Sequence, residues 1–229
     1  MNSKIVQSDA PVLLVGGGAA EPAVLAAAVR AAETVVAADG GAARVLALGR
    51  MPDAVYGDMD SLAPEIQERL APGVLRPVDE QDSTDFDKCL RHIAAPVVLG
   101  HGFLGDRLDH QLAAMTVLCL RPERRCVLVG AEDVVMLCPP EIALALAPGT
   151  RLSLFPMGPV TARSQGLRWP LDGLAFRPAG VIGTSNEVTG PLRLWMDAPV
   201  MLLILPVACL SELLAALAAA PGAWPARAG

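Results

Sequence analysis

The chain has 229 residues, of which 53% are hydrophobic and 18% charged, and its formal net charge is −6 at pH 7. So many hydrophobic residues exclude an intrinsically disordered chain, and the length allows one large domain or two small ones. The negative charge argues against a protein that follows a nucleic-acid backbone, because phosphates attract basic surfaces.

The first 140 residues alternate short apolar runs rich in β-branched residues with longer helical patterns. This alternation is typical of an α/β domain with a mostly parallel, doubly wound sheet and helices on both faces. Strands are expected at Val12–Val15, Thr34–Ala38, Ala54–Tyr56, Val74–Val78, Val97–Leu99 and Cys126–Val129. Helices are expected at Pro22–Ala32, Ala42–Leu48, Pro64–Leu70, Thr84–Ala94 and His110–Leu120.

The pattern changes near Pro148, after which short strand-like runs are separated by glycine and proline. Strands are expected there at Leu152–Phe155, Val160–Ala162, Leu192–Met196 and Val200–Leu205. We predict an α/β domain over residues 1–146 and a smaller, all-β sandwich domain over residues 147–229. A helical tail is expected at Ser211–Ala220.

The cysteines and the apolar runs favour a cytoplasmic protein. The five cysteines are an odd number without CxxC spacing, as expected for buried thiols in a reducing compartment. No signal peptide is visible, and the longest apolar stretch, Ala198–Leu210, contains two prolines and is too short to span a bilayer. No membrane partner is therefore expected.

Aspartates gather after three of the predicted strands. Ten of the fourteen lie between Asp39 and Asp109; Asp39 follows one strand, and Asp58 and Asp60 follow the next. Ligands of open parallel sheets bind beyond the carboxyl ends of the strands. The two carboxylates of GDMDS could share Mg²⁺, which also takes waters and substrate phosphates as ligands. The alternative is that these aspartates only form turns and caps.

A second acidic segment, QDSTDFDK, opens a predicted helix. Asp82 and Ser83 suit helix capping, whereas Asp85 and Lys88 are three residues apart and close enough to act at one site. Lys88 is one of only two lysines in a chain that otherwise uses arginine, which favours a contact with phosphate.

The loop Gly100–His110 combines three glycines with Arg107 and Asp109. Glycines let a backbone approach a ligand closely, and the guanidinium offers a fork for phosphate. Arg107 and Asp109 could instead be a purely structural ion pair. No GxxxxGK[ST] motif is present, and Gly16–Gly18 does not complete a dinucleotide fingerprint. The residues alone therefore predict a magnesium-dependent nucleotide transferase outside the P-loop class.

Several motifs in order resemble the thiamine pyrophosphokinase family over nearly the whole chain. They are DGGA (Asp39–Ala42), PDAVYGDMDS (Pro52–Ser61), DEQDSTDFDKCL (Asp79–Leu90), GDRLDH (Gly105–His110), SLFPMGPV (Ser153–Val160), GLRWPL (Gly166–Leu171) and TSNEV (Thr184–Val188). The resemblance implies an enzyme that transfers the pyrophosphoryl group of ATP to the hydroxyl of thiamine, giving thiamine diphosphate and AMP. It also implies a homodimer whose sites lie between subunits.

The resemblance also assigns roles by motif position. It implies Mg²⁺ ligands at Asp58, Asp60 and Asp85. It implies contacts with the nucleotide and the reacting phosphates from Asp39, Gln81, Ser83, Thr84, Lys88, Arg107 and Asp109. It implies a thiamine site at Trp169, Ser185 and Asn186. Indole is the best side chain for a flat cation, although Trp169 could instead be a core residue of the sandwich.

Two departures from the family pattern bear on this reading. Met59 stands where the family usually has phenylalanine, and Asp106 replaces a glycine before Arg107. Asp106 adds negative charge beside the phosphates. Two alternatives remain: a kinase or pyrophosphokinase that acts on another alcohol, and a nucleotide-binding relative that has lost catalysis. The many retained acids argue against the second.

Overall fold

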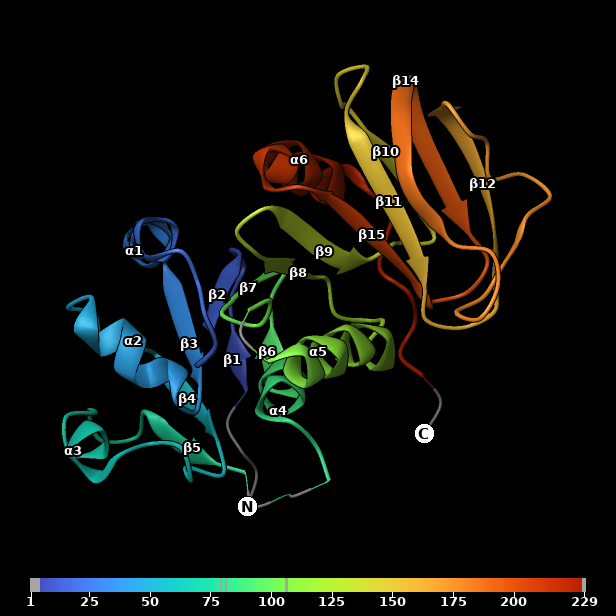
Figure 1. Cartoon of the computed structure of the whole chain (residues 1–229). Helices are drawn as coiled ribbons and strands as arrows, with labels where there is room; N and C mark the ends of the chain where they lie inside the picture. The colour runs from blue at the N-terminus through green and yellow to red at the C-terminus, as the bar shows by residue number, and fades with distance from the viewer. Residues whose placement is uncertain (1–4, 79, 81, 106, 228–229) are drawn as a thin grey trace. The chain divides into compact units, whose positions relative to one another are not determined.

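The computed structural model describes residues 5–78, 80, 82–105 and 107–227, and these form two compact units. The first unit contains the described residues up to Val117 together with Cys126–Ala131. The second unit contains Leu118–Arg125 and the described residues from Glu132 onward. The predicted α/β class is confirmed, since helices and strands alternate through the first unit and strands dominate the second (Figure 1).

Parallel strands form the main sheet of the first unit, in the order β8-β7-β2-β3-β4-β5. These strands are β2 (Val12–Val15), β3 (Thr34–Ala38), β4 (Ala54–Gly57), β5 (Leu75–Pro77), β7 (Val98–His101) and β8 (Cys126–Val129). All four residues of β2 are buried, as expected for a central parallel strand covered on both faces. A separate parallel pair joins β1 (Val6–Gln7) to β6 (Ile93–Ala94).

The helices of this part of the chain are α1 (Pro22–Ala31), α2 (Gly41–Ala47), α3 (Pro64–Gln67), α4 (Asp85–Arg91) and α5 (Leu108–Leu120). Leu25 and Val29 of α1 and Val45 of α2 share a buried cluster with Leu13 and Val35, which lie on one face of the sheet. Helix α4 packs against β3 and β4. Its first turn therefore lies close to the loops that follow these two strands.

Antiparallel strands form the second unit, in the order β13-β12-β14-β11-β15-β9, with β10 also beside β14. They are β9 (Asp133–Leu137), β10 (Glu141–Leu144), β11 (Arg151–Pro156), β12 (Val160–Leu167), β13 (Ala175–Phe176), β14 (Gly183–Met196) and β15 (Met201–Pro206). A short 3₁₀ helix, η1 (Val207–Cys209), leads into α6 (Leu210–Ala219), which packs against β10 (Figure 1).

The long strand β14 organises the second unit. Its first part pairs with β11, and its last residues pair with β10 on one side and β12 on the other. The sequence predicted only Leu192–Met196 of this strand, because Gly183, Gly190 and Pro191 are turn signals. Here pairing with three neighbours outweighs the local preference of those residues. Strands β9 and β10 were not predicted either.

The finer expectations about architecture stay predictions, namely the double winding, the sandwich and the division between residues 146 and 147. None of the helices in the described part of the chain is long and apolar enough to cross a membrane.

Candidate functional site

A cavity of about 490 Å³ lies at the carboxyl ends of the parallel strands in the first unit. Its lining comes from the segments that follow β2, β3, β4 and β7, together with the start of α4 and the first half of α5. Predicted site residues in this lining are Asp39, Asp58, Ser83, Thr84, Asp85 and Arg107. Four segments far apart in sequence thus bring acidic, polar and basic side chains to one place, at the edge of the sheet where ligands of parallel sheets bind.

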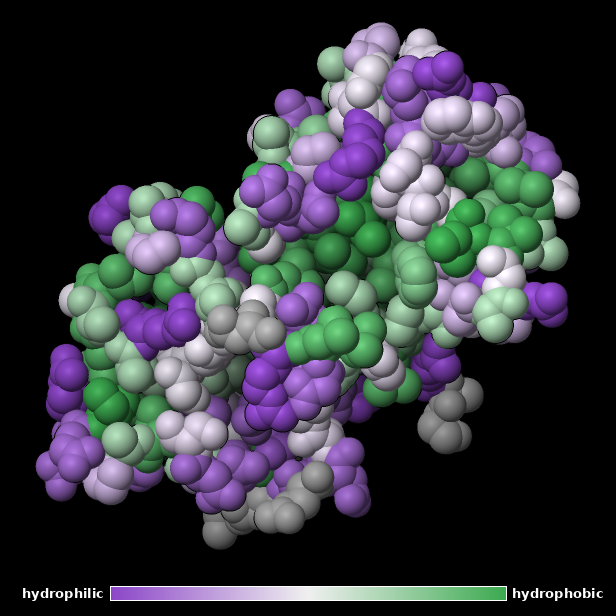
Figure 2. All heavy atoms as spheres, viewed as in Figure 1, coloured by the Kyte–Doolittle hydropathy of each residue, from purple (hydrophilic) through white to green (hydrophobic). Residues whose placement is uncertain are grey.

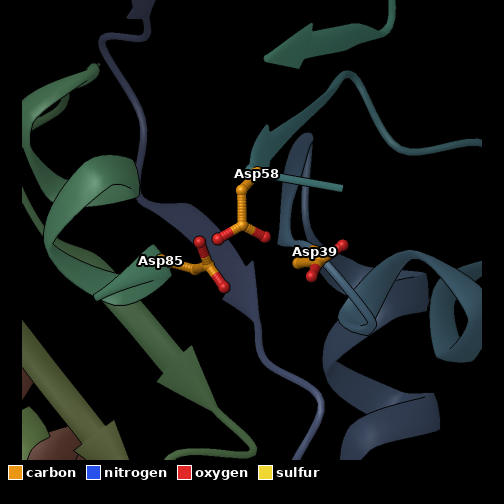
Figure 3. Close-up of side chains that lie close together, drawn as sticks. All are labelled: Asp39, Asp58 and Asp85. Atoms are coloured by element: carbon orange, nitrogen blue, oxygen red, sulfur yellow. The ribbon is translucent and has the colours of Figure 1, made fainter. Parts of the chain in front are cut away.

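Three carboxylates meet in this cavity (Figure 3). Asp39 follows β3, Asp58 follows β4, and Asp85 is the first residue of α4. One carboxylate oxygen from each lies within 4.8 Å of the others. A Cβ atom at Gly57 would lie 2.9 Å from the Cβ of Asp39, so only glycine allows the two loops to approach this closely.

Asp39 is the most deeply buried of the three, with 3% of its surface exposed. Its Oδ2 accepts a hydrogen bond from the Ser61 N–H at 3.0 Å, whereas its Oδ1 is buried without a hydrogen-bond partner among the described residues. Burial raises the pKa of Asp39; the Ser61 N–H lowers it in part, and the charges of Asp85 and Asp58 raise it further. A buried carboxylate oxygen without a donor, facing two more carboxylates, fits a divalent cation with oxygen ligands.

Asp60 is not one of the three residues that meet among the described carboxylates. Met59 adopts a left-handed conformation, with φ 68°, and the Asp60 N–H donates to Oδ1 of Asp58 at 3.2 Å. This hydrogen bond is the main reason why the pKa of Asp58 is lowered. The side chain of Asp60 itself is exposed. Its role as a Mg²⁺ ligand stays a prediction, and Asp39 is the carboxylate that the geometry adds.

Lys88 lies beside the carboxylates and is not among the described residues that line the cavity. Its side chain is 1% exposed, and Nζ donates to Oδ1 of Asp85 at 3.1 Å and to Oδ2 of Asp58 at 3.4 Å. Burial alone lowers the pKa of Lys88, but the hydrogen bonds and charges of Asp85 and Asp58 outweigh it and raise the pKa overall. The predicted contact with phosphate is untested.

Thr84 caps helix α4, whereas the sequence favoured Asp82 and Ser83 as the capping residues. The Asp87 N–H donates to Oγ1 of Thr84 at 3.2 Å, which satisfies one of the free donors of the first turn. Ser83 Oγ instead accepts from Nη2 of Arg91 at 3.0 Å. Gln81, also predicted to contact the nucleotide, lies outside the described residues.

Glycine loops close one wall of the cavity. The Gly18 N–H donates to the carbonyl of Gly102 at 3.1 Å, and Gly102 has a φ of +80° that favours glycine. A Cβ at Gly16 would lie 2.8 Å from the same carbonyl. Both glycine segments singled out in the sequence therefore pack on each other beside the three carboxylates.

Arg107 stands at the cavity with its guanidinium paired to Asp109. Nε and Nη2 of Arg107 lie 3.2 and 2.6 Å from the two oxygens of Asp109, and both side chains are well exposed. The hydrogen bond from Arg107 lowers the pKa of Asp109. Asp109 is not among the described lining residues. Exposure leaves the Arg107 fork free to turn toward an anion.

Several lining residues were not predicted as part of the site. Ser61 fixes Asp39 through its N–H, and His110 opens onto the cavity from α5. Phe86 and Phe103 also line it, with ring centroids 4.6 Å apart. Aromatic residues make up only 3% of the chain, so a phenylalanine inside the glycine loop, Phe103, was the signal in the sequence that could have indicated a lining residue.

A second, smaller pocket of about 200 Å³ lies in the second unit. It is lined by Trp169, Pro170, Leu171, Leu174, Phe176, Ile182, Gly183, Thr184 and Asn186. Trp169 is 54% exposed, which excludes the alternative of a core tryptophan within this unit. Hydrophobic side chains gather at the surface beside β12 (Figure 2), and Leu174, Val181 and Ile182 are exposed. The pocket suits a flat, partly apolar ligand.

The two other residues predicted with Trp169 are arranged differently. Asn186 is 5% exposed, and its side chain holds the backbone of Trp169: Oδ1 accepts from the Trp169 N–H at 3.2 Å, and Nδ2 donates to the Trp169 carbonyl at 2.7 Å. Ser185 has a left-handed φ of 59° and is not among the described lining residues. Its N–H donates to Oγ of Ser153.

Comparison with known proteins covers both units. Residues 25–128 match the family model "Thiamin pyrophosphokinase, catalytic domain", and residues 141–200 match "Thiamin pyrophosphokinase, vitamin B1 binding domain". The chain is 33% identical to thiamine pyrophosphokinase 3 of Oryza sativa subsp. japonica over 188 residues, 67% of this chain and 70% of that one. It is 32% identical to thiamine pyrophosphokinase 1 of Arabidopsis thaliana over 156 residues, 60% of this chain and 58% of that one.

Solved structures share the fold. The thiamin pyrophosphokinase from Candida albicans aligns with a TM-score of 0.71 at 15% identity, covering 89% of this chain and 93% of that one. At this identity the likeness concerns the fold alone. With both family models in sequence order and a relative above 30% identity along more than two thirds of its length, the chain belongs to the thiamine pyrophosphokinase family of diphosphotransferase enzymes.

Proposed function

We propose that this chain is a thiamine pyrophosphokinase that transfers the pyrophosphoryl group of ATP to the hydroxyl of thiamine in a Mg²⁺-dependent reaction, giving thiamine diphosphate and AMP. The observation that carries the proposal is the meeting of Asp39, Asp58 and Asp85 in a cavity that also contains Arg107 and glycine loops. Such a cavity suits a polyphosphate with its metal, because phosphoryl transfer depends on positioning and on neutralising charge.

In the proposed reaction, Mg²⁺ would be held by Asp39, Asp58 and Asp85 and would supply neutralisation of the charge that develops on the phosphates. The glycine segment Gly16–Gly18 would lie along the nucleotide, because residues without a side chain let a ligand approach the backbone closely. Arg107 would turn its fork from Asp109 to the phosphate oxygens. The roles implied for Asp60, Gln81, Ser83 and Thr84 remain part of the proposal, whereas the contact of Lys88 with phosphate stays a separate prediction from the sequence.

Thiamine would occupy the pocket of the second unit. Trp169 offers an exposed indole face to an aromatic cation, and the apolar side chains around it would hold the flat ring. Arg168 already lies over this indole, with Cζ 5.0 Å from a ring centroid, so the ring accepts a cation in the free protein. Asn186 would act by fixing Trp169.

The test is to incubate the purified protein with thiamine and Mg-ATP and identify the products by phosphorus NMR and chromatography, with Asp58→Asn as the control. We expect thiamine diphosphate and one AMP per turnover, both absent from the control. ADP in place of AMP would mean transfer of a single phosphoryl group, and turnover with another alcohol alone would indicate a different acceptor. Binding of ATP without any turnover would point to a relative that has lost catalysis.

We further propose that the enzyme acts as a cytoplasmic homodimer with a doubly wound nucleotide domain and a sandwich domain. All five cysteines are free and four are buried, which supports a reducing compartment. If sites are shared between subunits, a mixture of Asp58→Asn and Trp169→Ala subunits, assayed at low thiamine, would be more active than either variant alone. Sedimentation gives the mass, and a monomeric active enzyme would contradict the dimer.

A further inference from the structure

Lys88 is a buried cation that the proposed reaction does not require to touch a phosphate. It lies in the last turn of α4, and its side chain is 1% exposed. Its ammonium contacts one oxygen of Asp85 and one of Asp58, at 3.1 and 3.4 Å. Two of the three N–H donors of this ammonium are therefore directed at the carboxylates.

The three carboxylates need a positive charge when no metal is bound. Their oxygens lie within 4.8 Å of one another, and like charges at this distance repel strongly wherever water is partly excluded. Lys88 supplies one positive charge to Asp58 and Asp85. Asp39 keeps a buried oxygen, Oδ1, that accepts no hydrogen bond within the described part of the chain. Among the described residues, the group thus has one paired cation for its three acids, and it can accept further positive charge.

We propose that Lys88 is a positioning residue, a built-in counter-ion that holds Asp58 and Asp85 in place in the metal-free protein and limits how tightly the metal binds. This inference rests on the proposed function, because it takes the three carboxylates as the metal site. It differs from the contact with phosphate expected from the sequence, since that contact would require the ammonium to leave both carboxylates.

The charge of Lys88 and the charge of the metal act on the same oxygens. Removing the ammonium therefore destabilises the metal-free protein and strengthens the attraction for a divalent cation. A lysine that only binds phosphate would leave the affinity for the metal alone unchanged. A lysine that only fills space would lower the melting temperature equally with and without metal.

The experiment compares Lys88→Met in the full chain with wild type and with Arg91→Met. Arg91 is a matched control because it lies on the same helix and pairs with Glu80 and Asp87. Melting temperatures are measured in EDTA and in saturating Mn²⁺, and Mn²⁺ binding is measured by electron paramagnetic resonance without nucleotide. We expect Lys88→Met to melt lower in EDTA, to recover most of that loss in Mn²⁺, and to bind Mn²⁺ about tenfold more tightly. Arg91→Met lacks the tightening.

Unchanged or weaker Mn²⁺ affinity in Lys88→Met, with equal losses of melting temperature in both conditions, would overturn the proposal. If Lys88→Met does not fold, the double variant Lys88→Met/Asp58→Asn tests the proposal instead. Removing one acid should restore melting in EDTA if Lys88 is the counter-ion, and a double variant that stays as unstable contradicts it. If wild type binds no Mn²⁺, the metal site of the proposed function is wrong. The melting temperature of the double variant in EDTA then still shows whether Lys88 neutralises the charge of Asp58.

Discussion

The two pockets are built by opposite means. In the first unit, parallel strands end at one edge, and short loops after β3 and β4 bring Asp39 and Asp58 close to Asp85. In the second unit, antiparallel pairing around β14 leaves an apolar pocket with one exposed indole. Parallel strand ends thus gather charge for an anionic substrate with its metal, whereas the antiparallel unit offers a pocket lined by uncharged described residues, which suits a flat cation. The two pockets should respond separately to substitution.

The largest effect is expected in the first unit. Asp58→Asn removes a carboxylate from the group of three and leaves Lys88 with one acid fewer. We expect turnover to fall by roughly a thousandfold, because a metal at the phosphates contributes several kcal/mol to the transition state. Initial rates of AMP release measure the loss. Thiamine binding, followed by quenching of tryptophan fluorescence, should be unchanged, and a parallel loss of thiamine binding would break the comparison.

Comparing Asp39→Asn with Asp60→Asn shows which third carboxylate the site uses. The geometry favours Asp39, whereas the resemblance implied Asp60. We expect Asp39→Asn to lose Mn²⁺ binding together with Asp58→Asn. Mn²⁺ binding lost in Asp60→Asn and kept in Asp39→Asn would restore the set implied by the resemblance.

The next largest effect belongs to the second unit. Trp169→Ala removes the exposed indole, and we expect the KM for thiamine to rise about thirtyfold, since a cation–π contact contributes up to about 2 kcal/mol. The KM for ATP should not change. Steady-state kinetics with each substrate varied in turn measures both, and Trp169→Phe is the control that keeps an aromatic face. Equal increases in both KM values would contradict separate pockets.

Local patterns could be predicted where one physical cause dominates. The runs at Val12–Val15, Thr34–Ala38 and Cys126–Val129 are strands with the predicted bounds, because central parallel strands are buried on both faces and read as continuous apolar runs. The approach of Asp39 to Asp58 followed from the same logic of strand ends, whereas Asp85 joins them from the start of a helix. Strand β14 did not, since its pairing depends on three distant segments.

The choice between neighbouring acids depends on backbone angles that a sequence does not reveal. Left-handed conformations at Asp39 and Met59 decide which carboxylate points inward, and both residues adopt them without being glycine. The burial of Lys88 likewise depends on how α4 packs on β3 and β4. Its scarcity in the sequence marked it as unusual, but its partners became visible only in the fold.

A smaller effect is expected from replacing Asn186, whose side chain forms hydrogen bonds with the backbone of Trp169. Asn186→Ala leaves the N–H and carbonyl of Trp169 without their partners, at a cost of about 1–3 kcal/mol in the free energy of unfolding. We expect a several-fold rise in the KM for thiamine with little change in kcat. Urea unfolding and steady-state kinetics measure these, with Ser185→Ala as the control. A kcat loss as large as that of Asp58→Asn would place Asn186 at the reacting atoms.

The smallest effect concerns pH and belongs to the first unit, which contains all three histidines, whereas all three tryptophans lie in the second. His101, at the end of β7, is 4% exposed, and burial lowers its pKa below the usual 6.5. As the pH falls below 6.5, the unfolded chain binds a proton that the folded chain refuses, so stability is lost between 6.5 and the lower folded pKa.

His101→Gln removes this proton difference. Between about pH 7.5 and about pH 5.5 the wild type should lose more of its unfolding free energy than the variant, whose side chain does not titrate. Urea unfolding followed by circular dichroism at each pH measures the difference. Parallel losses in both proteins would mean that His101 is protonated equally in the folded and unfolded states. Tryptophan fluorescence reports on the second unit alone. If circular dichroism shows the difference between wild type and His101→Gln and tryptophan fluorescence does not, the two units unfold separately.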